Sequence, residues 1–174
     1  MEPFTFTCPC CGEEIVGLPD LGYDAPAFYA GIPEAERAQR ATLTSDLCTV
    51  DDEFFFVRAL CRVPIQAAEQ DFGWGVWVSL SKDNFRRYSE TYGDADQSKL
   101  GPMFGWFSNQ LPDYPGTLSL QTTVIPQDNN QRPLVYINDA HADHPLYVEQ
   151  RHGMPQAKLA EIYARNLCAG SGRG

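Results

Sequence analysis

The chain has 174 residues, of which 43% are hydrophobic and 12% aromatic. These values suit a folded protein with one sizeable core, and they exclude a largely disordered chain. The 23 acidic residues outnumber the 13 basic residues, which gives a formal net charge of −10. Because the basic residues form no run longer than Arg86-Arg87, the chain lacks the clustered positive charge with which proteins bind nucleic acids or anionic membranes.

The sequence predicts a cytoplasmic protein. Residues 1–8 lack the basic and apolar regions of a secretory signal. Every apolar run is far shorter than the roughly 20 residues that cross a bilayer. In the reducing cytoplasm, cysteines are usually reduced or metal-bound rather than paired in disulfides. We expect this of the six cysteines, which are Cys8, Cys10, Cys11, Cys48, Cys61 and Cys168.

The first half of the chain predicts a hairpin, a helix and three strands. The hairpin covers residues 4–18 and has a cysteine turn at its tip. Pro33 and the acidic residues that follow it predict a helix that begins at residue 32. Strands are predicted at 47–50, 53–60 and 73–80, the first two paired around Asp51-Asp52.

The strand over 73–80 carries a pattern that bears on its surroundings. Strict alternation places Trp74 and Trp77 on opposite faces of the sheet. Both faces of this strand therefore need cover, from helices or from a partner protein.

The second half of the chain predicts helices that are separated by one hairpin. Ser81 is the expected N-cap of a helix that ends at Gly93, and the residues from Met103 to Leu111 suggest a short helix rich in aromatic side chains. A β-hairpin with strands at 118–125 and 134–138 precedes the two closing helices, at 145–152 and 155–167.

The order of these elements indicates the fold class. Strands cluster in the middle of the chain, and helices fall between and after them, which favours an antiparallel or mixed sheet with helices on one side. We therefore predict a single α+β domain over residues 1–174, built on a central, mostly antiparallel sheet with helices packed on it. The cysteine-turn hairpin lies within residues 1–20, and residues 169–174 form a flexible tail.

The turn Cys8-Pro-Cys10-Cys11-Gly12 carries the sharpest chemical signal. Two thiolates three residues apart on a tight turn can face one zinc ion. A single Cys-x-x-Cys pair is half of a tetrahedral site, and the sequence contains no second pair. The alternative is that the cysteines are small reduced side chains, with Cys61 and Cys168 in the core.

Distinctive motifs are spread over almost the whole chain. They are the cysteine turn with Gly17-Leu18-Pro19, Ser45-Asp46-Leu47-Cys48, the stretch from Trp74 to Ser81, Phe104-Gly105-Trp106 with Asn109, Pro112 and Tyr114, and Asp143-His144-Pro145-Leu146. In these residues and their order, the chain resembles the bacterial domain-of-unknown-function family twenty-one ninety-nine, whose activity is not established. The resemblance implies that the cysteine turn and the Asp143-His144-Pro145 segment are features of the family.

The resemblance also bears on the zinc site. Members of the family often carry a histidine soon after the cysteine turn, where this chain has Ile15. Cys48 is the other cysteine within a matching motif, and it is therefore the expected third ligand beside Cys8 and Cys11. The fourth ligand stays open among Cys10, Cys61 and His144.

Two histidines lie close together among acidic residues, in the segment from Asp139 to His144. His141 and His144 can ligate a metal or supply an acid–base pair. The alternative is structural, because Asp143 or His144 can cap the helix that Pro145 begins. A nucleophilic pair of Cys48 and His144 requires the two side chains to be close in space.

Two functional hypotheses remain. The sequence has no nucleophile elbow, phosphate loop or dinucleotide fingerprint, which favours a non-enzymatic binding or regulatory module with a structural zinc and a basic protein partner. The candidate ligand or partner surface of this module consists of Trp77, Trp106, Asn109, Asp143 and His144. The alternative is a metal- or thiol-dependent enzyme that uses Cys48, His141 and His144.

Overall fold

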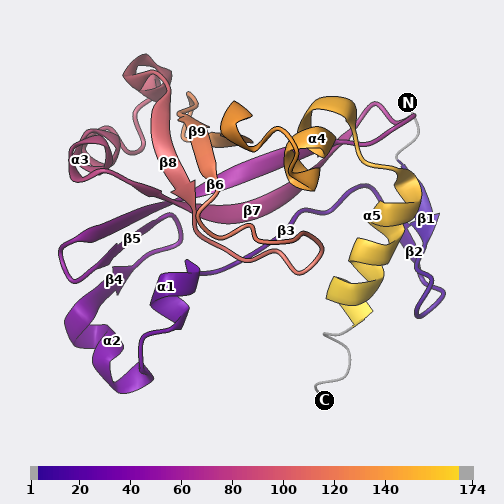
Figure 1. The fold of residues 1–174 in the computed structure, drawn as a ribbon, viewed down its shortest axis with the longest axis horizontal. Coiled ribbons are helices and arrows are strands. Elements are labelled where there is room, and N and C mark those ends of the chain that lie inside the picture. Colours follow the sequence, from indigo (N-terminus) through magenta and orange to yellow (C-terminus); the bar gives the residue numbers. More distant parts are fainter. Residues whose placement is uncertain (1–3, 169–174) are drawn as a thin grey trace.

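Five strands close into a small barrel. The computed structural model of the chain describes residues 4–168, and Figure 1 shows its ribbon. Each barrel strand pairs with the next, and the last pairs back with the first. In chain order the strands are β6 (Phe54–Pro64), β7 (Asp71–Leu80), β8 (Met103–Phe107), β9 (Gln121–Ile125) and β10 (Leu134–Ile137). Parallel and antiparallel pairs both occur, and helices surround the sheet, so the predicted α+β class is confirmed.

The barrel has a strongly paired side and a seam. β6 and β7 pair antiparallel from Phe55–Leu80 to Pro64–Asp71, whereas the parallel register of β10 and β6 consists of the pair Leu134–Leu60. The side chain of Gln150 bridges this seam. Its Oε1 accepts a hydrogen bond from the Ile137 amide at 2.8 Å, and its Nε2 donates to the Val135 carbonyl at 2.9 Å and lies 3.3 Å from Cys61 Sγ on β6.

Short strands extend the sheet beyond the barrel. β5 (Leu47–Val50) pairs with β6, β4 (Ala41–Leu43) pairs with β5, and β3 (Leu21–Gly22) runs parallel to β7. β1 (Thr5–Thr7) and β2 (Glu14–Val16) form a separate hairpin. The structure thus confirms the predicted cysteine-turn hairpin. It also confirms the strand pair around Asp51-Asp52, both of which have positive φ angles in the turn.

Two hydrophobic clusters cover the two faces of β7, as the alternation of Trp74 and Trp77 predicts. The larger cluster takes side chains from all five barrel strands and therefore fills the barrel; it includes Trp74 and Cys61. The smaller cluster lies on the outer face of β6 and β7 and consists of Ile32, Cys48, Val50, Phe56 and Trp77.

The helices differ in how firmly they are packed. α3 (Lys82–Glu90), α4 (Pro145–His152) and α5 (Gln156–Tyr163) each bury side chains against the barrel. α1 (Ala27–Ala30) and α2 (Glu34–Arg40) contain no buried residue and lie beside β4 and β5 in Figure 1. The helical turns η1 (Gln97–Leu100), η2 (Asp139–His141) and η3 (Ala164–Cys168) complete the described elements.

The helix predicted over 103–111 is wrong, because residues 103–107 form the strand β8. Burial alternates along β8: Met103, Gly105 and Phe107 face inward, while Phe104 and Trp106 face outward. Gly105 packs so closely that a Cβ atom at this position would lie 2.7 Å from the Ser79 carbonyl oxygen. The aromatic residues of this segment thus follow the period of a strand, and the central glycine is a poor helix former.

Other predicted bounds shift by a few residues. The helix expected from residue 32 begins at Glu34, and the last helix continues from Tyr163 into the η3 turn. The tail predicted at 169–174 lies outside the described residues. Within residues 4–168, no helix has the length and apolar character needed to span a bilayer.

Candidate functional site

The cysteine turn has a geometry suited to a thiolate. The Cys8 amide donates to the Glu13 carbonyl at 2.8 Å, and the Cys8 carbonyl accepts from the Gly12 amide at 2.9 Å, with Gly12 at a φ of 74°. Hydrogen bonds from the backbone of Cys11 and then of Cys10 lower the pKa of the Cys8 thiol. Cys11 is exposed. Cys10 is disulfide-bonded, contrary to the expectation of reduced or metal-bound cysteines, and is therefore not a zinc ligand here.

The described structure does not bring the other expected ligands to this turn. Figure 1 places β5, which carries Cys48, on the opposite side of the molecule from β1 and β2. Burial raises the pKa of the Cys48 thiol to about 11 and that of Cys61 to about 12. Among residues 4–168, no three His, Cys, Asp or Glu side chains gather as a metal site. Zinc binding at the turn stays a prediction. It is tested by comparing the metal content of the wild-type chain with that of a Cys8→Ser, Cys11→Ser variant.

Both histidines of the Asp139–His144 segment have structural partners. His141 Nε2 accepts from the Gln121 amide at 3.0 Å. His144 Nδ1 accepts from the Leu146 amide at 3.1 Å and so caps α4. Because a carbonyl only accepts, the 2.5 Å contact between His144 Nε2 and the Pro115 oxygen places the ring proton on Nε2. Asp143 is exposed. His144 therefore has the helix-capping role that was the structural alternative for this segment.

Of the five residues predicted as a partner surface, Trp77 and Asn109 lie in the interior. Trp77 is fully buried, and its indole Nε1 donates to the Tyr23 carbonyl at 3.0 Å. Asn109 Oδ1 accepts from the Trp77 amide at 2.7 Å, and Asn109 Nδ2 donates to the Ala25 carbonyl at 3.0 Å. These two side chains thus hold the segment that leads into α1. Trp106, in contrast, is 44% exposed.

Trp106 forms part of an apolar groove on the outside of the barrel. The groove has a volume of about 820 Å³ and runs between α1, the start of β6 and the ends of β7 and β8. Phe28 of α1 packs on Phe54 at a centroid distance of 4.7 Å and forms one wall. Trp106 and Leu118 belong to the other wall, and all four side chains are substantially exposed. We refer to this feature as the aromatic groove.

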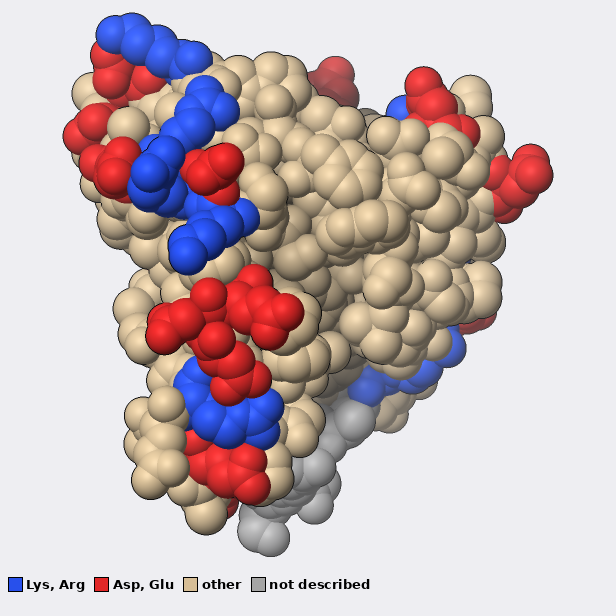
Figure 2. Space-filling model, turned by 60° about the vertical axis from the view of Figure 1, so that its left-hand side comes forward, with Lys and Arg blue, Asp and Glu red and all other residues tan. Residues whose placement is uncertain are grey.

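The charge around the aromatic groove is acidic at one end. Glu53 is the charged residue of its lining, and Asp51 and Asp52 precede it in the exposed β5–β6 turn. Asp51 pairs with Arg40 at 2.8 Å, whereas Asp52 and Glu53 have no ion pair with any residue that the structure describes. Figure 2 turns the side with α2, α3, β4 and β5 forward; acidic and basic side chains gather along it in alternating patches beside a largely uncharged surface.

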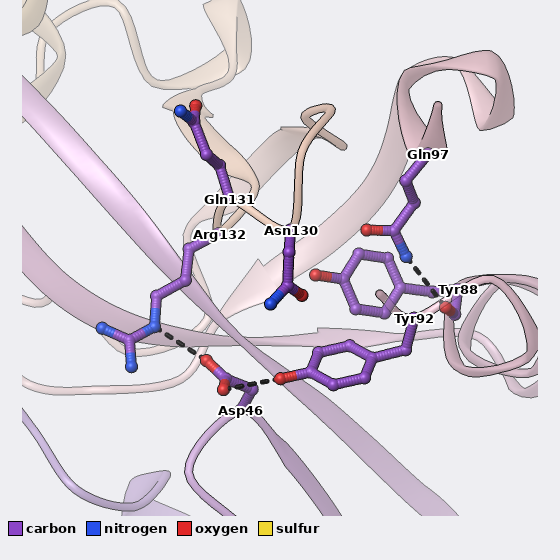
Figure 3. Close-up of a pocket in the computed structure, with 7 residues that line it drawn as sticks. All are labelled: Asp46, Tyr88, Tyr92, Gln97, Asn130, Gln131 and Arg132. Carbon is purple, nitrogen blue, oxygen red and sulfur yellow. Dashed lines mark hydrogen bonds and ion pairs between the residues drawn. The ribbon is translucent and has the colours of Figure 1, made fainter. Parts of the chain in front are cut away.

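A second, polar pocket of about 240 Å³ lies between three segments of the chain. Tyr88, Tyr92 and Gln97 come from α3 and the stretch after it, Asp46 from the turn before β5, and Asn130, Gln131 and Arg132 from the β9–β10 loop. Figure 3 shows these side chains around the pocket. No lining residue is shared with the aromatic groove.

Asp46 organises one wall of the polar pocket. Its carboxylate accepts hydrogen bonds from Arg132 Nε at 2.7 Å, from the Tyr92 hydroxyl at 2.8 Å and from Ser45 Oγ at 2.9 Å. Burial alone would raise the pKa of Asp46, but the bonds from Arg132, Tyr92 and Ser45 outweigh it and lower the pKa. Burial, with Asp46 and Tyr92 nearby, raises the pKa of the Tyr88 hydroxyl. The pocket therefore holds an ionised Asp46, neutralised by Arg132, and a protonated Tyr88.

The sequence indicated the aromatic groove only in part. Trp106 was among the predicted surface residues. No sequence pattern indicated Phe28 and Leu118, because they line the same groove as Trp106 only in the folded chain. The polar pocket was missed altogether, since its side chains come from positions 46, 88–97 and 130–132. The turn-forming residues after Gln127 were the one available sign that this loop adopts a defined conformation.

Comparisons with known proteins give a family but no described activity. No curated protein and no solved structure is significantly similar to this chain. Residues 7–154 match the family described as an uncharacterized protein conserved in bacteria (DUF2199), which is the family indicated by the motifs in the sequence. Since the match covers most of the 174 residues, the chain belongs to the DUF2199 family of uncharacterised bacterial proteins.

Proposed function

We propose that this protein is a non-enzymatic binding module that holds a segment of a partner protein in the aromatic groove. The observation that carries the proposal is the exposure of Phe28, Phe54, Trp106 and Leu118 around one groove of about 820 Å³. Proteins rarely expose a contiguous apolar surface of this kind, and where one occurs it commonly marks an interaction site. Aromatic residues, tryptophan above all, are the side chains that anchor partners most strongly.

The expected partner segment carries apolar anchors followed by a lysine or arginine. The apolar lining suits aliphatic or aromatic side chains, which bury against Phe54 and Trp106. Glu53 and Asp52 at one end have no ion pair with a described residue of their own chain, and a basic side chain of the partner provides one. The net charge of −10 favours the same sign of partner over longer distances.

The placement of the candidate catalytic residues supports a binding role over the thiol-enzyme alternative. Cys48 lies in the smaller hydrophobic cluster beside Phe56 and Trp77, and burial raises the pKa of its thiol to about 11. The imidazoles of His141 and His144 are engaged with the amides of Gln121 on β9 and Leu146 on α4, neither of which belongs to that cluster. A nucleophilic cysteine needs an accessible thiolate and a nearby base.

The fluorescence of Trp106 can report binding in the groove. Of its three tryptophans, Trp74 and Trp77 are buried and Trp106 is exposed. Peptides selected from a random display library on the immobilised protein are expected to contain aromatic or aliphatic residues beside lysine or arginine. Their binding is expected to shift the tryptophan emission to shorter wavelength, and Trp106→Phe is expected to abolish this shift.

Affinity measurements with the selected peptides give the decisive comparison. Trp106→Ala is expected to weaken binding by about tenfold or more, because an anchor contact is lost. Glu53→Gln is expected to reduce the salt dependence of binding. The matched control is Tyr136→Ala, an exposed aromatic residue on β10 outside the groove, which is expected to bind like the wild type. Peptides that bind Trp106→Ala as tightly as the wild type contradict the proposal.

A further inference from the structure

The polar pocket is lined by mostly buried side chains that turn unpaired polar atoms towards it. Tyr88 is 2% exposed, and its hydroxyl makes no hydrogen bond with any described residue. Figure 3 shows this hydroxyl directed into the pocket, towards Asn130. The hydroxyl oxygen itself is open to the pocket rather than sealed in the core, so water or a ligand can pair it there.

Gln97 presents a second such group. This side chain is 3% exposed, and its Nε2 donates to the Tyr88 carbonyl at 2.9 Å and to Thr91 Oγ1 at 3.3 Å. Because these bonds fix the amide orientation, Oε1 is left to accept a hydrogen bond, and no described residue donates one. Figure 3 shows this oxygen on the pocket side of the amide.

Asn130 adds a donor and an acceptor from the opposite wall. Its backbone has a φ of 59°, a left-handed conformation that asparagine tolerates better than most residues. The side-chain amide makes no hydrogen bond with the described part of the chain, and Figure 3 shows it pointing towards Tyr88 and Tyr92. Three segments thus converge polar atoms on one space.

The electrostatics of the pocket select against a charged ligand. Asp46 and Arg132 neutralise each other at 2.7 Å, and the Asp46 oxygens already accept three hydrogen bonds. Asp94 and Asp128 lie in the segments that carry Gln97 and Asn130 and disfavour an anion, whereas the charge of Asp96 is paired with Lys99. The ligand that fits is therefore uncharged. It must donate a hydrogen bond to Gln97 Oε1 and also accept hydrogen bonds.

Hydroxyl groups meet this requirement, since each of them donates and accepts. The volume of about 240 Å³ equals about eight waters at roughly 30 Å³ each, which gives room for one ring with its hydroxyls. We propose that the polar pocket binds a small uncharged polyhydroxylated molecule, namely a monosaccharide, through Tyr88, Gln97 and Asn130. This site is separate from the aromatic groove, and its test does not depend on the function proposed for that groove.

The experiment is a titration of the ¹⁵N-labelled full chain followed by amide chemical shifts. The probes are D-glucose, D-galactose, D-mannose and D-ribose, each added to concentrations on the order of 10 mM, because small polar ligands bind weakly. At least one probe is expected to give saturable shifts centred on residues 88, 97 and 130. Inorganic phosphate serves as the charged comparison and is expected to give none there.

Two variants separate recognition from folding. Tyr88→Phe removes one oxygen that has no protein partner, so we expect an unchanged or higher thermal midpoint together with about a tenfold loss of sugar affinity. Asn130→Gly keeps the left-handed backbone, and we expect it to weaken binding as well. Tyr147→Phe, whose hydroxyl bonds Asp139 outside the pocket, is the matched control and is expected to bind like the wild type.

The outcomes are distinct. Saturable shifts that Tyr88→Phe and Asn130→Gly both weaken support the monosaccharide site. If no sugar gives saturable shifts, the pocket holds water only and the proposal is overturned. Binding that persists unchanged in Tyr88→Phe, or preferential binding of phosphate, overturns it equally.

Discussion

Asp46 shows how one side chain joins parts of the chain that are far apart in sequence. It sits in the turn before β5, and it receives Tyr92 from the end of α3 and Arg132 from the β9–β10 loop. Its side chain is only 16% exposed, so these charge-assisted bonds are less screened than those of a surface pair. The hydrogen bonds favour the ionised form, which makes the stability that they contribute dependent on pH.

The sign of that dependence follows from the lowered pKa of Asp46. The stabilisation is fully present above the ordinary aspartate pKa of about 3.9 and is lost as the pH falls through the lower pKa of the folded state. We expect Asp46→Asn to cost about 1–2 kcal/mol in the free energy of unfolding at pH 7. As the pH falls further below that ordinary value the two proteins should converge, because the wild-type side chain becomes protonated.

Urea unfolding across this pH range measures the difference. Asp143→Asn, a change at an exposed carboxylate, is the control and should stay within about 0.5 kcal/mol of the wild type at every pH. A gap between Asp46→Asn and the wild type that is as large at low pH as at pH 7 would assign the cost to packing rather than to charge.

At the residue scale, the sequence predicted what single side chains do better than which side chains lie together. The capping role of the Asp143-His144 segment was one of its two alternatives, and the structure assigns the cap to His144. Cys48 and the cysteine turn, in contrast, were joined only by a family motif, and the fold separates them. A ligand set depends on which strands lie side by side, and residue types alone do not contain that information.

At the scale of elements, the seam between β6 and β10 is the weakest junction of the barrel. Its parallel register contains the pair Leu134–Leu60, and α4 lies against both strands. Gln150 of α4 replaces the missing backbone pairs by binding Ile137 and Val135 on β10 and by contacting Cys61 on β6. Gln150 thus supplements a sparse backbone pairing, in which the Leu60 amide donates to the Pro133 carbonyl at 2.9 Å.

We expect Gln150→Leu to lower the free energy of unfolding by about 2–4 kcal/mol, because it leaves the buried Ile137 amide and Val135 carbonyl without partners. Amide exchange at Ile137 should accelerate more than exchange elsewhere in β10. Gln156→Leu is the matched control: its amide binds the Gln66 carbonyl at an exposed site, where water replaces it, and the expected change is within about 0.5 kcal/mol. Equal costs for the two variants would show that the seam does not depend on Gln150.

Elements with one strong local signal were predicted correctly, and elements with mixed signals were not. Ser81, Pro145 and Gly153 mark helix ends by caps and backbone angles that act within one turn, so α3 and α4 were found. The segment from Met103 carries aromatic residues that suit either period, and its strand conformation comes from pairing with β7 and β9. Barrel closure is a longer-range property still, because it joins β6 to a strand about seventy residues later.

At the scale of the whole molecule, stability is unevenly distributed. The larger cluster involves every barrel strand together with α3, α4 and α5, whereas α1 and α2 bury no residue of their own. The segment before α1 is attached through Trp77 and Asn109, as described above, and through the hydrogen bond from the Ala27 amide to the Ser108 carbonyl. One wall of the aromatic groove thus belongs to the part of the molecule with the fewest buried contacts, where local opening costs least.

Hydrogen exchange followed by mass spectrometry is expected to show this division. Residues 27–40 should exchange well before β7 and β9 do, because opening this segment uncovers only the smaller cluster, through Ile32, and leaves the larger cluster in the barrel intact. Asn109→Ala removes the bonds to the Trp77 amide and the Ala25 carbonyl, so we expect exchange over residues 23–31 to rise by about tenfold. Asn84→Ala on α3, which removes an exposed hydrogen bond from Arg87, is the control and should leave both regions unchanged.

The pattern of the response decides what Asn109 does. If acceleration stays within residues 23–31 and the flanking part of β7, then α1 opens as a local unit and the groove can widen for a partner without unfolding the barrel. Peptides that bind the groove should then slow exchange in the same residues, because they add contacts to Phe28 and Phe54. Uniform acceleration across β9 and β10 would mean instead that Asn109 stabilises the whole fold, and the groove would have to accept its partner as a rigid surface.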